Sequence, residues 1–275
     1  MKNLQMFCLT LEPNHYNFIK ELGYSPVGLG DKNFDSKWFS DRSEENISKK
    51  NKNYGEYTFH YWIWKNYLDK LDSKWIGFCQ YRKFWSLSEY ENNKISFDNL
   101  NNKVLKQIPA KFDEYESIIG TPIFVNQWKP MKFIKKGLKF FIKKPLVIFN
   151  KGKRNINFHF DLMHGENNLS KAINLLDEKN KNDFSKYVNS EVSFSPHNMF
   201  ICNSKTKMKN YYQDLFSWLD KCEKLFGFDN LKGYGKIRIY GFLAERYLAF
   251  WFNKYTNPLI WPIAFFDINK NNIDT

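Results

Sequence analysis

Residues 75–83 read Trp-Ile-Gly-Phe-Cys-Gln-Tyr-Arg-Lys, and this stretch is the strongest indication of the fold class. The apolar run from Trp75 to Tyr81 is typical of a β-strand buried on both faces in a parallel sheet. It ends abruptly at Arg82 and Lys83. Ligands of open α/β sheets bind at the carboxyl ends of such strands, so the two cations mark a candidate site.

The segments around this strand alternate between strand and helix patterns. A helix is predicted over 54–71, and we assign its aromatic residues Tyr61, Trp62 and Trp64 to the core. Residues 30–52 form a long polar loop. Further strands are predicted over 5–11, 26–29, 116–120 and 197–202, and further helices over 13–22, 167–178, 183–187, 204–225 and 239–253. The pattern predicts an α/β fold, a single domain over 1–275 with a mostly parallel central sheet flanked by helices.

The composition narrows the class of protein. The chain has 275 residues, of which 43% are hydrophobic and 26% charged, as expected for a soluble globular protein. It has no run of about 18 apolar residues, so no transmembrane helix is predicted. The first residues contain no signal-peptide cleavage site, and secretion is not expected. The four cysteines are scattered, which favours a reduced, cytoplasmic setting.

The positive charge is concentrated in one stretch. Residues 129–154 hold ten basic and no acidic residues, so the rest of the chain carries 13 − 10 = +3. Between Pro130 and Pro145, apolar side chains recur at helical spacing among lysines. We therefore expect 131–144 to form an amphipathic helix on the anionic inner face of the cytoplasmic membrane. A lid, or a surface helix packed on the core, is the alternative.

The usual enzyme signatures are absent. The sequence has no P-loop, no Gly-x-Gly-x-x-Gly after the first strand, no Gly-x-Ser-x-Gly and no His-Glu-x-x-His. It also lacks an Asp-x-Asp motif. His159 and His164 flank Asp161 at a spacing that suits a metal poorly, and we expect an ordinary polar loop with one histidine facing a pocket.

Four blocks in order resemble a bacterial glycosyltransferase family. They begin with Glu-Asn-Ile-Ser-Lys-Lys-Asn at 45–51, which leads to Tyr-Trp-Ile-Trp-Lys-Asn at 61–66. Ile-Gly-Phe-Cys-Gln-Tyr-Arg-Lys-Phe at 76–84, Asn-Met-Phe-Ile at 198–201 and Tyr-Gly-Phe-Leu-Ala-Glu-Arg at 240–246 follow. The family is found in capsule, exopolysaccharide and O-antigen clusters and is typified by inverting galactofuranosyltransferases with a GT-A-like fold. Gln80 stands where the family has His, and the basic insertion at 129–154 is longer than expected.

The resemblance implies a UDP-sugar donor. Arg82 and Lys83 replace the usual acidic pair and would neutralise the diphosphate, so no metal or other cofactor is expected. The alternative is that both are solvated charges at a strand end. Glu56 serves the donor or the helix dipole, and Asn51 or Asn53 could instead cap the helix. Together with Arg82 and Lys83, the expected donor-binding residues are Asn46, Ser48, Lys49, Asn53, Glu56 and Arg246.

An inverting transferase also needs a general base. Glu245, in the last block, is the first candidate, and Asp161 is the reserve. The alternative for Glu245 is an ion pair with Arg246 that holds the last helix to the core. His159, His164 and Asn198 are expected to line the acceptor side of a pocket.

The sequence therefore predicts transfer of a furanose-form galactosyl or N-acetylgalactosaminyl unit to a growing surface polysaccharide. The acceptor would be lipid-linked, and the enzyme would lie on the inner face of the cytoplasmic membrane without a nucleic-acid partner. A pyranose donor is the first alternative. A non-catalytic protein that binds nucleic acid or another anion, and a transferase-like scaffold, are the others.

Overall fold

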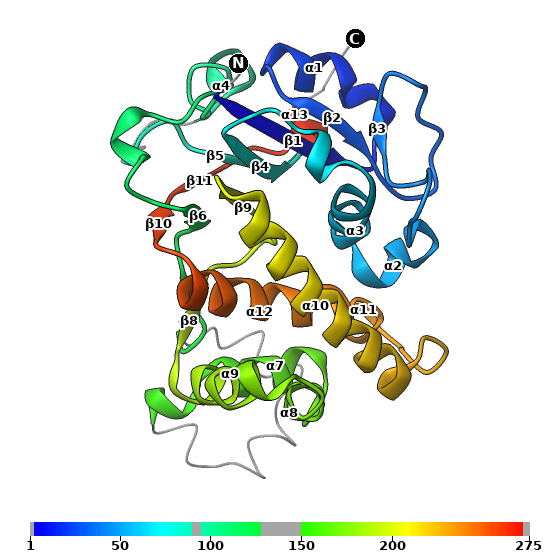
Figure 1. The fold of residues 1–275 in the computed structure, drawn as a ribbon, viewed down its shortest axis with the longest axis vertical. Coiled ribbons are helices and arrows are strands. Elements are labelled where there is room, and N and C mark those ends of the chain that lie inside the picture. The colour runs from blue at the N-terminus through cyan, green and yellow to red at the C-terminus, as the bar shows by residue number, and fades with distance from the viewer. Residues whose placement is uncertain (1–2, 90–94, 128–149, 272–275) are drawn as a thin grey trace. The chain divides into compact units, whose positions relative to one another are not determined.

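The computed structural model describes residues 3–89, 95–127 and 150–271 (Figure 1). The chain packs into two compact units. Unit 1 comprises Met1–Thr121, His197–Gln213 and Trp251–Thr275, and unit 2 comprises Pro122–Pro196 and Asp214–Phe250. Helices α10 (Lys205–Phe226) and α12 (Ile239–Tyr255) contribute residues to both. The expected single domain over 1–275 stays a prediction.

Within the described residues, unit 1 is built on a nine-stranded sheet. Its main path has the order β10-β6-β9-β4-β1-β2-β3, and four of these six neighbouring pairs are parallel. The predicted α/β class, with a mostly parallel central sheet flanked by helices, is confirmed. The strands are β1 (Leu4–Thr10), β2 (Ser25–Gly28), β3 (Phe39–Ser40), β4 (Trp75–Gln80), β5 (Lys83–Trp85), β6 (Ser117–Gly120), β9 (Phe200–Cys202), β10 (Pro258–Trp261) and β11 (Ile263–Phe265).

Strand β4 lies inside the sheet, between β1 and β9, which explains its apolar sequence. The Phe78 ring packs between two neighbouring strands, 5.8 Å from the Phe7 ring and 5.1 Å from the Phe200 ring. A Cβ at Gly77 would approach the Ile201 side chain to 2.9 Å, so β9 packs closely only because the residue is glycine. The strand predicted over 75–81 is confirmed, one residue shorter.

The single helix predicted over 54–71 is wrong in its limits. The chain forms α2 (Asn51–Tyr54), α3 (Tyr57–Asn66) and a 3-10 turn, η3 (Leu68–Lys70). Gly55 separates the two helices with φ 59° and ψ −131°, a conformation that side-chain-bearing residues seldom adopt. Trp62 is buried as expected, whereas Tyr61 and Trp64 are partly exposed.

Short helical segments complete unit 1. The segments predicted over 13–22 appear as a 3-10 turn followed by one helix, and the loop over 30–52 contains both β3 and a 3-10 turn. The segments are η1 (Pro13–His15), α1 (Tyr16–Glu21), η2 (Ser48–Lys50), α4 (Phe97–Leu100), η4 (Ala110–Phe112) and α13 (Ile268–Asn271).

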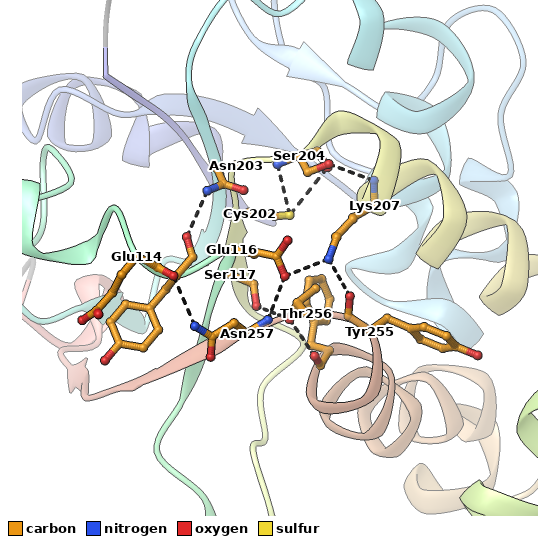
Figure 2. A network of polar contacts seen from close by, with 12 residues as sticks. Glu114, Glu116, Ser117, Cys202, Asn203, Ser204, Lys207, Tyr255, Thr256 and Asn257 are labelled. Atoms are coloured by element: carbon orange, nitrogen blue, oxygen red, sulfur yellow. Dashed lines mark hydrogen bonds and ion pairs between the residues drawn. The ribbon is translucent and has the colours of Figure 1, made fainter.

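A polar network joins α10, β6 and the end of α12 within unit 1 (Figure 2). Lys207 Nζ donates to Glu116 Oε2 at 2.7 Å and to the Tyr255 carbonyl at 2.7 Å. The Asn257 N–H donates to the same Glu116 oxygen at 2.9 Å. Glu116 directly precedes β6, and β6 pairs with the end of β9, so the network fixes the sheet at the amino-terminal end of β4.

Unit 2 is mostly helical. The region around His159, expected to be a polar loop, is instead helix α7, because Ile156 and Phe160 form a buried face and the Asn155 side chain accepts from the Phe158 N–H. The helix predicted over 167–178 ends at Ile173, and the next helix is longer than predicted. The elements are β7 (Ile123–Phe124), η5 (Lys151–Lys153), α7 (Ile156–His164), α8 (Asn168–Ile173), α9 (Glu178–Ser190), β8 (Ser193–Phe194) and α11 (Tyr234–Ile237).

In the described part of the chain, no helix combines the length and the apolar character needed to span a membrane. The amphipathic helix predicted over 131–144 lies outside the described residues, as does most of the basic stretch over 129–154. Arg154, at its end, is buried and donates from Nη1 to the Asn126 carbonyl at 3.3 Å. This arginine therefore has a structural contact within unit 2.

Candidate active site

The parallel half of the unit 1 sheet contains a topological switch point. From β1 the chain passes through α1 and adds β2, then β3, on one side of β1. It returns through α3 and adds β4 on the other side. Ligands of open α/β sheets bind outside the carboxyl ends of strands at such points. The carboxyl ends of β1 and β4 therefore form the candidate active site of unit 1.

A series of hydrogen bonds links three side chains at the carboxyl end of β1. The buried ring of His15 has Nδ1 2.7 Å from Thr10 Oγ1 and Nε2 2.8 Å from Asn269 Oδ1. The amide oxygen is an acceptor, which assigns the proton to Nε2 and makes Nδ1 the acceptor for the hydroxyl. Burial lowers the pKa of His15, partly offset by its bond to Asn269. The imidazole is thus a neutral structural link between β1 and the C-terminal segment.

Arg82 lies in the two-residue turn between β4 and β5. Its Nε is 3.0 Å from Asp267 Oδ2, and its guanidinium carbon is 4.8 Å from the centroid of the Tyr81 ring. The C-terminal segment also bonds to this turn, because the N–H groups of Phe266 and Ile268 donate to the carbonyls of Arg82 and Tyr81. The side chain of Arg82 is 51% exposed. An anchored but accessible guanidinium suits the recognition of a phosphate group.

Lys83 belongs to a second cluster at the same strand end. Its Nζ donates to Gln80 Oε1 at 3.3 Å, and Gln80 Nε2 donates to the His197 carbonyl at 2.7 Å. His197 and Asn198 both have positive φ values, 85° and 55°. Left-handed backbone at a non-glycine residue costs on the order of 1–3 kcal/mol and is common at ligand sites. The two predicted residues Lys83 and Asn198 thus lie at one edge of the sheet, with His197 between them.

The loop before α3 forms part of this edge. A methyl group at Gly30, just after β2, would lie 3.7 Å from Asn51 Oδ1. The Asn51 side chain does not cap the start of α2 or α3, which begin without a side-chain cap; instead its Nδ2 donates to the Gly55 carbonyl and to Thr58 Oγ1, both at 3.0 Å. Burial raises the pKa of Tyr81, and the charge of Glu56 adds a smaller part of the rise, so this carboxylate lies within electrostatic range of the end of β4.

The other predicted donor residues of this loop serve its own structure. Asn46 Oδ1 accepts from the N–H and hydroxyl of Ser48, at 3.2 and 2.8 Å, and forms a local turn. Lys49 is exposed, and Asn53 is partly buried within α2. These positions leave the lysine accessible to a ligand, while Asn46 and Ser48 shape the loop that presents it.

Asp41 was not predicted as a site residue. It follows β3 and is fully buried. Burial raises the pKa of its carboxyl, and the nearby Thr58 offsets part of the rise. Neither carboxylate oxygen has a hydrogen-bond partner at normal geometry among the described residues. Buried polar side chains in folded proteins nearly always have such a partner, so Asp41 is an exception.

In unit 2, three of the predicted residues come together. Arg246 is buried against the Phe194 ring, 4.3 Å from its centroid, and its Nη1 forms an ion pair with Glu245. Its Nη2 is 3.3 Å from His159 Nδ1. Burial, with the neighbouring guanidinium, lowers the pKa of His159 to about 3, so the imidazole is neutral and accepts from Arg246. The structure therefore contains the ion pair between Glu245 and Arg246, which is the alternative to a role of Glu245 as general base.

Asp161 and His164 have structural contacts in unit 2. Asp161 Oδ1 accepts from the Asn167 N–H at 2.9 Å, which holds the turn after α7. His164 is buried, stacks 4.0 Å from the Phe242 ring and lies with Nδ1 3.0 Å from the Gly235 carbonyl. The structure thus groups Glu245, Arg246 and His159, and it places His164 in the core of unit 2.

Several residues at the edge of unit 1 were missed from the sequence. Thr10, His15, Asp267 and Asn269 carry no local motif, and His15 and Asn269 are 254 positions apart. The one available signal was a histidine shortly after the first strand. Across the described ranges, no group of three or more His, Cys, Asp or Glu side chains could hold a metal ion.

Comparisons with known proteins agree with the fold. No curated protein matches the chain. The apo structure of the WbbM bifunctional glycosyltransferase is similar, with a TM-score of 0.69 and 17% identity over 96% of this chain. This chain spans 45% of the length of that protein. The mannosyltransferase Ktr4p from S. cerevisiae matches with a TM-score of 0.27 and 10% identity over 81% of this chain and 61% of that one, too low to support an argument.

The likeness to WbbM establishes that this chain has a glycosyltransferase-like fold. A family model described as "Domain of unknown function (DUF4422)" matches residues 9–257, which is most of the chain. The protein therefore belongs to the DUF4422 family.

Proposed function

We propose that this protein is an inverting glycosyltransferase that uses a UDP-sugar donor. The observation that carries the proposal is the switch point between β1 and β4, where Arg82 lies anchored beside the strand end in a glycosyltransferase-like fold. A nucleotide-sugar needs cations at its diphosphate, because negative charge develops on the leaving group as the glycosidic bond breaks.

The proposed donor site is independent of metal. Arg82 binds the diphosphate through its guanidinium, held at Nε by Asp267, and Lys83 supplies a second positive charge from the next strand. Glu56 and Lys49 belong to the loop at the same edge and would meet the nucleoside. In this scheme the two cations take the part that an Asp-x-Asp motif and a divalent ion play in other transferases.

The proposed reaction is a single displacement. The acceptor hydroxyl oxygen attacks the anomeric carbon, the bond from that carbon to the diphosphate oxygen breaks, and its electron pair leaves with the UDP. The proton of the hydroxyl goes to a general base, for which the sequence offers Glu245 first and Asp161 in reserve. The neutral His159 and the guanidinium of Arg246 would hold Glu245 in place.

The proposed sugar is a furanose-form galactosyl unit or its N-acetylated relative. The proposed acceptor is a growing, lipid-linked surface polysaccharide. Both specifics rest on the resemblance of the sequence blocks and on the glycosyltransferase-like fold. A pyranose donor is the alternative, and Gln80 in place of the family's His is the residue that could decide the preference.

Calorimetry with purified protein tests this proposal. We expect UDP to bind with equal affinity with and without EDTA. Transfer assays with UDP-galactofuranose and UDP-galactopyranose then decide the ring form. Activity that EDTA abolishes and manganese restores would disprove the metal-independent donor site, and a protein that binds no UDP would overturn the proposed function.

A further inference from the structure

Three side chains form a row across neighbouring strands of unit 1. Gln80 of β4 is directly opposite Lys83 of β5, and Lys83 is directly opposite Phe265 of β11. Residues directly opposite in antiparallel strands point to the same face, with Cβ atoms about 5 Å apart. The aromatic ring of Phe265 therefore lies beside a lysine at the candidate active site.

The exposure of Phe265 is unusual for its surroundings. Phe265 is 62% exposed, whereas its neighbours Ala264 and Phe266 are each 5% exposed. Leaving a phenylalanine ring in water forgoes the favourable free energy of burying its apolar surface. The sequence thus places a large apolar ring at an alternating strand position where a polar side chain would be normal.

The ring of His197 packs against Phe265 at the end of this row. The two rings meet edge-on, with 5.5 Å between centroids, and the backbone carbonyl of His197 is held by Gln80. Burial, with the charge of Lys83, lowers the pKa of His197 to about 3. A neutral imidazole can both donate and accept a hydrogen bond, as sugar hydroxyl groups require.

We propose that Phe265, with His197 and Lys83 beside it, is the platform for the sugar ring of the donor. The assignment rests on the proposed function. In a nucleotide-sugar, the sugar is joined directly to the outer phosphate, whereas the base lies two phosphates away. A ring beside Lys83, the cation assigned to the diphosphate, therefore meets the sugar. The ring faces the apolar C–H surface of the sugar, and the polar neighbours bind its hydroxyls.

Phe265→Ala tests this assignment, with Phe265→Trp as the conservative variant. Phe97→Ala is the matched control, because Phe97 is a 44% exposed phenylalanine of unit 1 that lies on α4, outside the row from Gln80 to Phe265. Calorimetry is done with UDP, UDP-galactofuranose and UDP-galactopyranose. We expect Phe265→Ala to weaken binding of the preferred UDP-sugar about tenfold and to leave UDP binding unchanged. The Trp and control variants should bind both like wild type.

The outcomes separate this inference from the proposed function. If wild type binds UDP-sugar and Phe265→Ala binds it equally well, the platform is wrong and the proposed function stands. An equal loss of UDP and UDP-sugar affinity would place the ring against the uracil and would also overturn the assignment. If wild type binds neither UDP nor a UDP-sugar, the proposed function itself fails. Thermal unfolding of each variant verifies that the fold is intact.

Discussion

Arg82 is the residue on which we expect donor binding to depend most. Its Nε is anchored by Asp267, so the guanidinium is oriented before the ligand arrives, and it remains half exposed. A hydrogen bond to a charged group contributes about 1.5–3 kcal/mol. Arg82→Gln should therefore weaken UDP binding by roughly 10- to 150-fold in calorimetry.

The control for this variant is Lys74→Gln. Lys74 is also about half exposed and also pairs with an aspartate, Asp113, but it precedes β4 rather than following it. The Lys74→Gln substitution should leave UDP affinity unchanged. Equal effects of the two substitutions would show that the loss reflects overall charge and not a phosphate contact at the end of β4.

Glu245 has two possible roles that one substitution can separate. Glu245→Gln keeps the shape and an oxygen that can accept from Arg246, but it cannot take a proton. We expect turnover to fall at least about 100-fold with little change in the KM for the donor. Asp161→Asn preserves the acceptor for the Asn167 N–H and should retain turnover.

Steady-state kinetics together with thermal unfolding checks this prediction. Normal turnover in Glu245→Gln, combined with a loss in Asp161→Asn, would move the general base to Asp161. A large fall in melting temperature in Glu245→Gln would instead identify the Glu245–Arg246 pair as structural, because Arg246 is buried and would lose its counter-charge.

At the scale of elements, the network around Glu116 ties two helices to the sheet of unit 1 (Figure 2). Lys207 and the Asn257 N–H hold the pKa of Glu116 below its usual value. A carboxyl with a depressed pKa stabilises the fold above its unfolded pKa of about 4.3. That contribution is lost as the pH falls through the lower, folded value.

Glu116→Gln should therefore destabilise the protein near neutral pH and have less effect in acid. The Glu116 side chain is 41% exposed, and screening limits the loss to about 0.5–1 kcal/mol, or a few degrees in melting temperature. Asp220→Asn, which removes an exposed pair within α10, is the control and should change little. A difference between wild type and Glu116→Gln that grows below pH 4 would contradict the prediction.

At the scale of the whole molecule, charge is distributed unevenly along the chain. Ten of the +13 formal charges fall in residues 129–154, most of which lie outside the described residues. We propose that the lysine-rich segment over 131–144 binds anionic lipid at the inner face of the cytoplasmic membrane. Each lysine near such a surface contributes about 1 kcal/mol at modest ionic strength.

Liposome flotation tests this membrane binding. Wild type should float with vesicles containing phosphatidylserine and be released by high salt. A variant in which six lysines become Gln should remain in solution; the six are Lys132, Lys135, Lys136, Lys139, Lys143 and Lys144. Neutral phosphatidylcholine vesicles are the control. Equal flotation of both proteins with anionic vesicles would rule out the proposed role of the lysines.

Local patterns in the sequence were enough to predict the class of fold and the end of the central strand. An apolar run such as 75–80 is typical of a strand buried on both faces inside a sheet, so the sequence predicted its interior position. Arg82 and Lys83 were found for the same reason, since a charge directly after such a run must lie at the strand end. The helix limits were predicted wrongly because one residue, Gly55, takes a non-helical backbone conformation and divides the helix.

The tertiary structure decided which side chains contact Arg82 and His15 at the strand ends. Asp267 and Asn269 reach Arg82 and His15 only because the C-terminal segment returns to the ends of β1 and β4. The row from Gln80 to Phe265 depends on strand register, and the alternation of side chains along a strand cannot specify a register between Lys83 and Phe265, which are 182 positions apart. The sequence by itself determined which strand ends in positive charge. Folding alone determined which side chains hold that charge in place, because their contacts join segments that share no local pattern.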